Sequence, residues 1–250
     1  MPEQLDMLIN TGVYPDRYVQ EPAFSSLLQG NQQKHPDHDI NGTFSFDLHG
    51  GGGGMIMALR ILDGFLESDK ISNGLVVAGD SAIREGLSGQ YQYDSHAGAV
   101  MLMKDEPGRG FIRFAHDTYP VYLESFSSCT KYVGGELKTF INQSDKYTEQ
   151  SIQCVSESLT VFLAGEQLEL NDIDLFITSQ NPTGFASQLN RSLKGDRVII
   201  INGRKRLYSA GMAFALDQAI NTDQFSSAKR VLFITAGSGI TVDMALYNNR

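Results

Sequence analysis

The sequence contains no tryptophan and only two cysteines, Cys129 and Cys154, in 250 residues. Two cysteines cannot provide the disulfide framework on which small secreted domains depend. Long apolar runs are missing too, since no stretch approaches the roughly 18 residues of a membrane-spanning helix. The first residues, MPEQLDMLIN, have neither a basic segment nor an apolar signal region. We therefore expect a cytoplasmic protein that is not inserted in a membrane.

Basic residues are also scarce, with 20 Lys and Arg against 29 Asp and Glu, which gives a net charge of −9. Binding to a phosphate backbone requires clustered Lys and Arg side chains. The one basic cluster, Arg204, Lys205 and Arg206, is short and is more simply interpreted as a solvated loop. We expect no nucleic-acid partner.

Short apolar runs alternate with helical patterns along the whole chain. Apolar positions recur at about 3.6 residues in Met55, Leu59, Leu62 and Leu66, which predicts a helix. The runs typical of buried strands are 6–12, 42–48, 73–79, 97–103, 173–179, 196–202, 229–235 and 241–247. This alternation predicts two duplicated α/β units, 1–105 and 106–250, each with a mixed, mostly parallel sheet covered by helices.

A run of five glycines, Gly50–Gly54, lies between a predicted strand and a predicted helix. Glycine costs up to about 1 kcal/mol in a helix, so the run indicates either a close approach to the backbone or the loss of a larger side chain. A G-x-G-x-x-G frame would end on Met55 or Ile56, and no G-K-S or G-K-T follows. A nucleotide site is not favoured, and we expect no cofactor.

The stretch FDLHGGGGGMIMALRILDGFL resembles the nucleophile elbow of thiolase-fold condensing enzymes, in particular the ketoacyl-ACP synthase III group with its F-D-(V/L)-x-x-A-C-x-G-F motif. SHAGAVMLM is similar to the G-D-G-A-G-A segment of that group. DIDLFITSQNPTGFASQLNRSL resembles its D-x-x-x-P-H-Q-A-N segment, and FITAGSGITVDMAL resembles its terminal glycine turn. The resemblance covers nearly the whole chain and implies the thiolase-like α/β/α/β/α layering.

The resemblance also implies that the catalytic residues are replaced. The acylated cysteine of the family falls on Gly52, its histidine on Ser179 and its asparagine on Arg206. A thiolate at a helix N-terminus and two polarising side chains carry the family's chemistry, and this chain lacks all three. The backbone N–H groups of Gly52 and Gly239 could still form an anion-binding oxyanion nest.

Members of the family begin with a strand and a helix that have no match here, because Met1 lies only a few residues before the segment LDMLINTG. We expect the first unit to lack this strand and helix, either because the start of the chain is short or because the gap is covered from elsewhere, for example by another chain. The segment GTFSFDL is predicted to be an edge strand that pairs antiparallel with a partner chain.

Other candidate residues have simple structural interpretations. His35, Asp37, His38 and Asp39, together with nearby His49, could be metal ligands, but a solvated turn is favoured and we expect no metal. Cys129 is a weaker candidate for a displaced nucleophile, since no histidine follows His116, and Cys154 is expected in the core. Tyr91, Tyr93 and His96 are expected to line a pocket, or else to serve in packing or in a dimer contact.

Two functional classes remain open. The first is a non-catalytic ketoacyl synthase III-like subunit, a pseudoenzyme that pairs as a heterodimer with an active homologue in fatty-acid or polyketide-type biosynthesis. The second is an acyltransferase or thioesterase that keeps the nest and uses another nucleophile or water; a weaker third is an acyl-ligand sensor.

The partner hypothesis assigns roles to further residues. The resemblance implies that Glu21, before Pro22, could enter the partner's active site as a base, and the alternative is that it is a helix N-terminal charge. The carrier would be coenzyme A or acyl carrier protein, for which Arg191 and Lys194 are the docking candidates.

Overall fold

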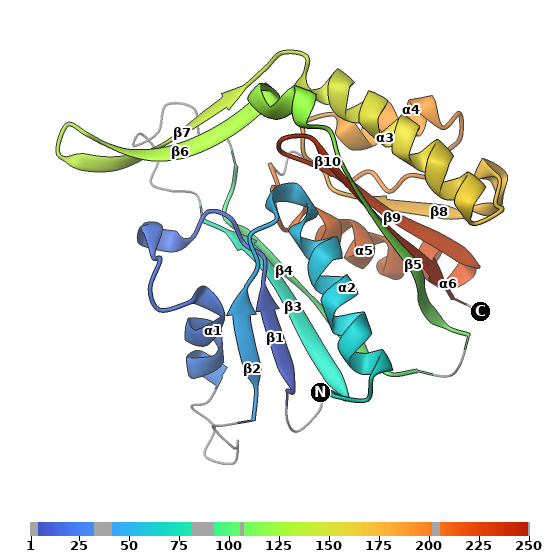
Figure 1. The fold of residues 1–250 in the computed structure, drawn as a ribbon, viewed down its shortest axis with the longest axis horizontal. Coiled ribbons are helices and arrows are strands. Elements are labelled where there is room, and N and C mark those ends of the chain that lie inside the picture. Colours follow the sequence, from blue (N-terminus) through green and yellow to red (C-terminus); the bar gives the residue numbers. More distant parts are fainter. Residues whose placement is uncertain (1–4, 33–41, 82–92, 106–107, 202–205, 250) are drawn as a thin grey trace.

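The computed structural model describes residues 5–32, 42–81, 93–105, 108–201 and 206–249 (Figure 1). Two four-stranded sheets lie face to face, with helices between them and on their outer faces. Among the described residues, no helix combines the length and the apolar character needed to cross a membrane.

The first sheet comes entirely from the first part of the chain. Its strands are β1 (Met7–Asn10), β2 (Phe44–Asp47), β3 (Asn73–Asp80) and β4 (His96–Met103), in the spatial order β2-β1-β3-β4. β1 pairs in parallel with both β2 and β3, whereas β4 runs antiparallel to β3. The segment 42–48 thus forms an edge strand, as predicted.

The second sheet also has four strands, and two of them, β5 and β10, form its antiparallel side. Its strands are β5 (Gly110–Thr118), β8 (Leu175–Thr178), β9 (Arg230–Gly237) and β10 (Thr241–Asn248), in the order β5-β10-β9-β8. β8 and β9 are parallel, and β10 is antiparallel to both of its neighbours. A hairpin of β6 (Phe126–Val133) and β7 (Glu136–Gln143) extends from one end (Figure 1).

The helices complete the layers. They are α1 (Phe24–Gln32), α2 (Gly54–Glu67), α3 (Tyr147–Gly165), α4 (Phe185–Ser192), α5 (Gly211–Asn221) and α6 (Gln224–Ser227), with short 3-10 turns η1 (Asp16–Tyr18), η2 (Gly51–Gly53), η3 (Pro120–Ser125) and η4 (Leu170–Asp172).

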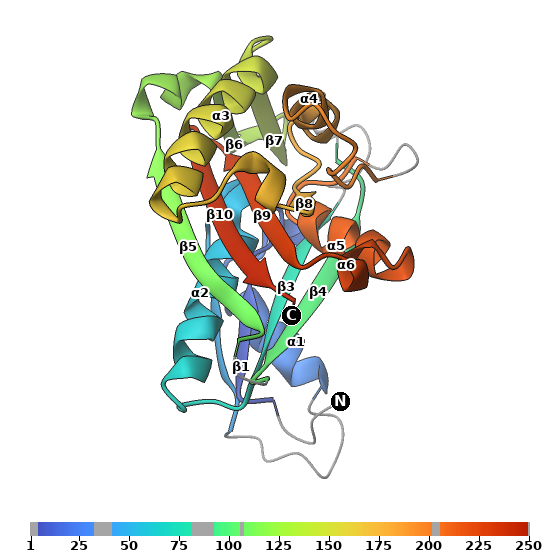
Figure 2. The same ribbon diagram turned by 90° about the vertical axis from the view of Figure 1, so that its right-hand side faces the viewer.

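Helices α2 and α5 lie between the two sheets and contact both of them. Helix α1 packs on β1 and β2, and α3 packs on β9, β10 and α4, so these helices form the outer layers (Figure 2). The predicted α/β/α/β/α arrangement is confirmed. The predicted apolar face of α2 is buried as well, including Leu59 and Leu62, because both sides of this helix face a sheet.

The prediction of a strand over 196–202 was wrong. Over 196–201, the part of this segment that the structure describes, one bridge forms, between Phe176 and Val198. The Gln180 side chain then donates to Ile199 O at 3.4 Å and accepts from Ile201 N at 3.3 Å. The Gln180 side chain thus forms hydrogen bonds with backbone groups that, in a longer strand, would have paired with β8.

Candidate functional site

The glycine run turns the chain from the end of β2 into α2 and brings it against the β9–β10 turn. Gly51 has a φ of +53°, in the left-handed region that favours glycine. A Cβ on Gly51 would lie 3.1 Å from Ser238 Oγ, in that turn. The turn at the N-terminus of α2, called the head of α2 below, therefore requires glycine at position 51 both for its backbone conformation and for its packing.

Gly52, which the sequence resemblance predicts at the place of the nucleophile, is buried against backbone. A Cβ on Gly52 would lie 3.2 Å from Ala236 O and 3.6 Å from Gly237 Cα. A Cβ on Gly53 would overlap the Asp243 carboxylate. The run therefore serves the close approach of α2 to the second sheet, and Gly52 has little room for a side chain.

Ser179 is buried and engaged in its own loop. Its hydroxyl donates to Asn181 O at 2.9 Å, and Tyr93 OH donates to Asn181 Oδ1 at 2.9 Å. The Ser179 hydroxyl is thus held by a structural hydrogen bond. Tyr93 is buried and serves in packing, while Tyr91 lies outside the described residues.

Arg206 lies at the surface. Its side chain donates to Asp94 Oδ1 from Nη2 at 2.8 Å and from Nε at 3.3 Å, and its backbone N donates to Asp94 Oδ2 at 3.0 Å. These bonds lower the pKa of Asp94. The Arg206 guanidinium is committed to this pair, which is mostly exposed. Arg204 and Lys205 lie outside the described residues.

Buried aromatic rings occupy the space beside Gly51. The rings of Tyr14 and Tyr93 lie 5.3 and 4.8 Å from that of Tyr208, centroid to centroid, and the Phe126 ring stacks on Tyr208 at 6.2 Å. The Tyr208 hydroxyl would be 3.8 Å from a Cβ on Gly51. The tyrosines are far apart in the sequence, so sequence reasoning missed this cluster.

Burial disfavours ionisation of the Tyr14 and Tyr208 phenols. It raises the pKa of Tyr14 to about 12 and the pKa of Tyr208 well above its usual value. Tyr147, which stacks on Phe126 at 5.3 Å, also has a raised pKa because of burial. The glycine run thus faces a core of closely packed aromatic rings.

A second polar pair that sequence reasoning missed lies behind the run. His116 Nδ1 and Asp243 Oδ1 are 2.7 Å apart, across the paired strands β5 and β10. Burial raises the pKa of Asp243, while His116 acts in the opposite direction. The other carboxylate oxygen faces Gly53. In the described part of the chain, neither cysteine is hydrogen-bonded to His116, whose Nε2 lies 3.3 Å from the exposed hydroxyl of Thr118.

The two cysteines differ in environment. Cys154 is buried in α3, and burial raises the pKa of its thiol to about 11, so the prediction of a core residue is confirmed. Cys129 is exposed on β6. His35, Asp37, His38 and Asp39 lie outside the described residues, and His49 is exposed.

Glu21 is exposed in the loop before α1. The helix N-terminus is capped instead by Asp47, which accepts from Phe24 N at 2.7 Å and from Ser25 N at 2.8 Å. Asp47 therefore caps α1, and both roles given to Glu21 stay predictions. Arg191 and Lys194, at the end of α4, are exposed.

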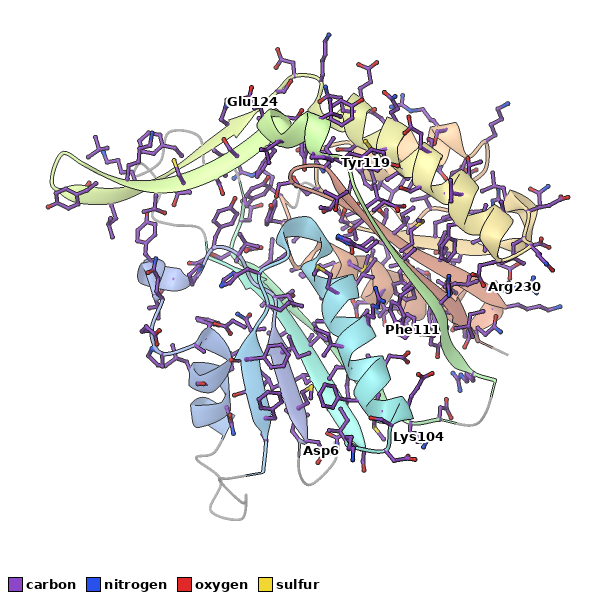
Figure 3. The ribbon with its side chains drawn as sticks, viewed as in Figure 1. Asp6, Lys104, Phe111, Tyr119, Glu124 and Arg230 are labelled. Atoms are coloured by element: carbon purple, nitrogen blue, oxygen red, sulfur yellow. The ribbon has the colours of Figure 1, made fainter. Side chains whose placement is uncertain are left out.

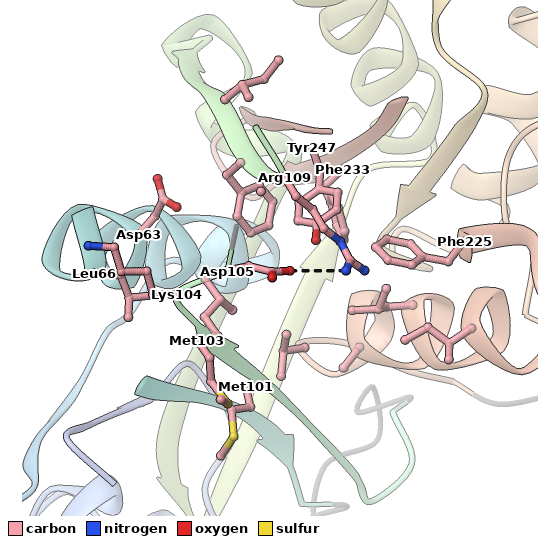
Figure 4. A pocket seen from close by; sticks show the side chains of 18 of the residues that line it. Asp63, Leu66, Met101, Met103, Lys104, Asp105, Arg109, Phe225, Phe233 and Tyr247 are labelled. Carbon is pink, nitrogen blue, oxygen red and sulfur yellow. Dashed lines mark ion pairs between the residues drawn. The ribbon is translucent and has the colours of Figure 1, made fainter. Parts of the chain in front are cut away.

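A cavity of about 600 Å³ lies at the opposite end of α2 from the glycine run (Figure 4). It is bounded by β4, the C-terminal part of α2, the start of β5 and α5, and none of the predicted site residues lines it. Lys104 and Phe111 mark this end of the molecule, whereas Tyr119 lies at the far end of β5 (Figure 3). Partial burial and the charge of Glu67 raise the pKa of Asp63 at its rim to about 6.

No protein-family model matches the chain. It is 23% identical over 255 residues to a β-ketoacyl-[acyl-carrier-protein] synthase III of Ehrlichia ruminantium (strain Gardel), covering 98% of this chain and 77% of the relative. A synthase III of Wolbachia pipientis wMel is 24% identical over 250 residues, covering 96% and 75% of the two chains.

Solved structures agree in fold. The 3-oxoacyl-[acyl-carrier-protein] synthase III from Aquifex aeolicus VF5 superimposes with a TM-score of 0.79 at 19% identity, covering 98% of this chain and 77% of that one. This chain has the ketoacyl synthase III fold. A variant of OleA from Xanthomonas campestris shares the fold with a TM-score of 0.80 at 17% identity, covering 98% and 76%. In this fold, Gly52 lies in the short turn directly before the N-terminus of α2.

Proposed function

We propose that the chain is a non-catalytic ketoacyl synthase III-like subunit that pairs with an active condensing enzyme in fatty-acid or polyketide-type biosynthesis. The observation that supports this most directly is Gly52, which has no side chain to acylate and whose Cβ position is crowded by Ala236 O. The buried tyrosines beside Gly51 further support a head of α2 that binds no acyl chain.

The similar proteins suggest the chemistry of the complex. The curated relatives are named as β-ketoacyl-[acyl-carrier-protein] synthases III, and another variant of OleA from Xanthomonas campestris was solved with bound lauric acid and lauroyl-CoA. We propose that the active partner carries the acyl group, delivered by coenzyme A or acyl carrier protein. If the carrier protein docks on this subunit, Arg191 and Lys194 supply the positive charge.

The proposed interface is the edge of the first sheet formed by β2. Phe44 on this strand is 57% exposed, and its ring lies 5.3 Å from that of Phe46. An exposed apolar edge strand invites pairing with another strand. Antiparallel pairing with a partner strand would cover Phe44 and continue the sheet into the partner. Glu21 belongs to the loop that leads into α1, which packs on β2.

The test is the Glu21→Gln variant in a complex reconstituted with a ketoacyl synthase III homologue from the same genome. A positioned base contributes about 10²–10⁴-fold to rate, so we expect kcat of the complex to fall about 100-fold with KM nearly unchanged. The matched control is Glu157→Gln, at an exposed position of α3, which should leave kcat unchanged.

Analytical sedimentation shows whether the Glu21→Gln complex is still intact. Loss of kcat in an intact complex supports a role for Glu21 in the partner's site. Unchanged kcat removes that role and leaves the chain a structural partner. A chain that purifies alone as an active homodimer contradicts the pairing itself.

A further inference from the structure

His116 on β5 and Asp243 on β10 lie side by side at the N-terminal end of α2. The two residues are directly opposite in the antiparallel register, and His116 Nδ1 is 2.7 Å from Asp243 Oδ1. The carboxylate also touches the head of α2, because a Cβ on Gly53 would overlap it. Both side chains therefore project from the face of the second sheet that is turned toward α2.

The hydroxyl of Thr118 completes a chain of three polar groups. Thr118 follows His116 by two residues on β5, so its side chain projects from the same face. Its Oγ1 lies 3.3 Å from His116 Nε2, the ring nitrogen that does not contact Asp243. A hydroxyl, an imidazole and a carboxylate are thus linked in the order in which a nucleophile, a base and an orienting group act in acyl transfer.

The carboxylate determines which imidazole nitrogen can act as the base. Asp243 Oδ1 accepts the proton of Nδ1 in neutral His116, and Nε2 is then the acceptor for the proton of Thr118. Hydroxyl–imidazole bonds of this kind are often longer before a substrate binds, so a separation of 3.3 Å fits the role.

The three groups also differ in exposure as such a site requires. Asp243 is 2% exposed, whereas 40% of the His116 side chain is exposed and Thr118 lies at the surface. Burying a carboxylate is costly, and among the described residues nothing donates a hydrogen bond to Asp243 Oδ2. Gly53 makes the room for this oxygen. A buried carboxylate thus orients a base and a hydroxyl that a substrate can reach.

We propose that Thr118, His116 and Asp243 form a hydrolytic site for short-chain acyl esters and thioesters. Thr118 and His116 are the catalytic residues, and Asp243 is the positioning residue. The two catalytic residues lie at the surface and do not line the cavity at the other end of α2. We therefore expect donors of about acetyl size rather than long chains such as lauroyl. The site does not use Gly52 and goes beyond the proposed pairing.

The reaction has two steps. Thr118 Oγ1 attacks the acyl carbon while its proton passes to His116 Nε2, and the imidazolium then gives this proton to the leaving thiolate or alkoxide. The product of this step is an acyl-threonine ester. In the second step, water attacks the ester as His116 takes its proton, the carboxylic acid leaves, and the proton returns to Thr118 Oγ1.

The test is labelling with a fluorophosphonate, in which Thr118 Oγ1 displaces fluoride from phosphorus and keeps a stable phosphonate ester. We expect one adduct per chain, located at Thr118 by peptide mass spectrometry. Mass identifies the labelled subunit, so the chain is labelled both alone and with a condensing partner, and the result does not depend on pairing. His116→Gln should slow labelling at least about 100-fold.

Turnover is measured with p-nitrophenyl acetate and the chain alone. Thr118→Val should abolish labelling and lower kcat/KM at least about 100-fold, with an unchanged circular dichroism spectrum. The matched control is Thr130→Val, at another exposed strand threonine, which should behave like the wild type. Asp243→Asn should lower kcat at least tenfold with KM nearly unchanged, a split that a purely structural carboxylate would not produce.

The decisive variants are at the exposed positions Thr118 and His116, so misfolding of Asp243→Asn leaves the test valid. An adduct that forms only elsewhere, for example on Cys129, would overturn the proposal. Absence of labelling, or turnover that Thr118→Val leaves unchanged, would do the same. Labelling of Thr118 without any turnover of p-nitrophenyl acetate would also contradict a hydrolytic site.

Discussion

Replacing Gly53 with alanine is expected to lower the free energy of unfolding by about 2–4 kcal/mol. The new Cβ would overlap the Asp243 carboxylate, which is buried and held by His116 at 2.7 Å. Neither the carboxylate nor the head of α2 can move without breaking that pair or separating the helix from the second sheet. The measurement is urea denaturation followed by circular dichroism.

The matched control lies in the same helix. Gly64 in α2 faces open space, since no atom would lie within 4 Å of an added Cβ. Gly64→Ala should therefore stabilise the protein by up to about 1 kcal/mol through helix propensity. Equal effects of the two substitutions would show that the glycine run is not packed as described.

Replacing Asp80 with alanine should destabilise the protein by at least about 3 kcal/mol. The buried carboxylate accepts from Val13 N at 3.0 Å and Tyr14 N at 3.1 Å in the first half of the chain. It also accepts from Ser209 N at 2.8 Å and Ser209 Oγ at 2.6 Å in the second half. Truncation leaves these donors without their acceptor and removes a link between the halves.

Asp94→Ala is the comparison for this prediction. Asp94 also accepts several hydrogen bonds, but from Arg206 at the surface. Water replaces such bonds, so the free energy of unfolding should fall by less than about 1 kcal/mol. Thermal denaturation of both variants gives the contrast, and a larger loss for Asp94 than for Asp80 would contradict it.

The sequence predicted those elements whose apolar pattern reports burial. β3, β9 and α2 are buried between layers, so their side chains had to be apolar. The hairpin β6–β7 was not predicted, because most of its residues are exposed. A strand exposed on both faces does not alternate apolar and polar residues, so its sequence gives little signal.

The candidate site was predictable only as far as local motifs reach. The glycine run marked the head of α2, but its partners, Ser238 and Asp243, come from the other end of the chain. The tyrosine cluster and the His116–Asp243 pair likewise depend on contacts between distant segments, which one sequence does not reveal. The roles assigned to Gly52, Ser179, Arg206, Gly239 and Glu21 stay predictions.

The most direct test of the central claim is the intact mass of each subunit after the reconstituted complex has been incubated with lauroyl-CoA. An acylated cysteine adds the mass of one lauroyl group. Because Gly52 offers no nucleophile, we predict that this chain keeps its mass while the partner gains one lauroyl group. A stoichiometric lauroyl adduct on this chain, at Cys129 or elsewhere, would contradict the account.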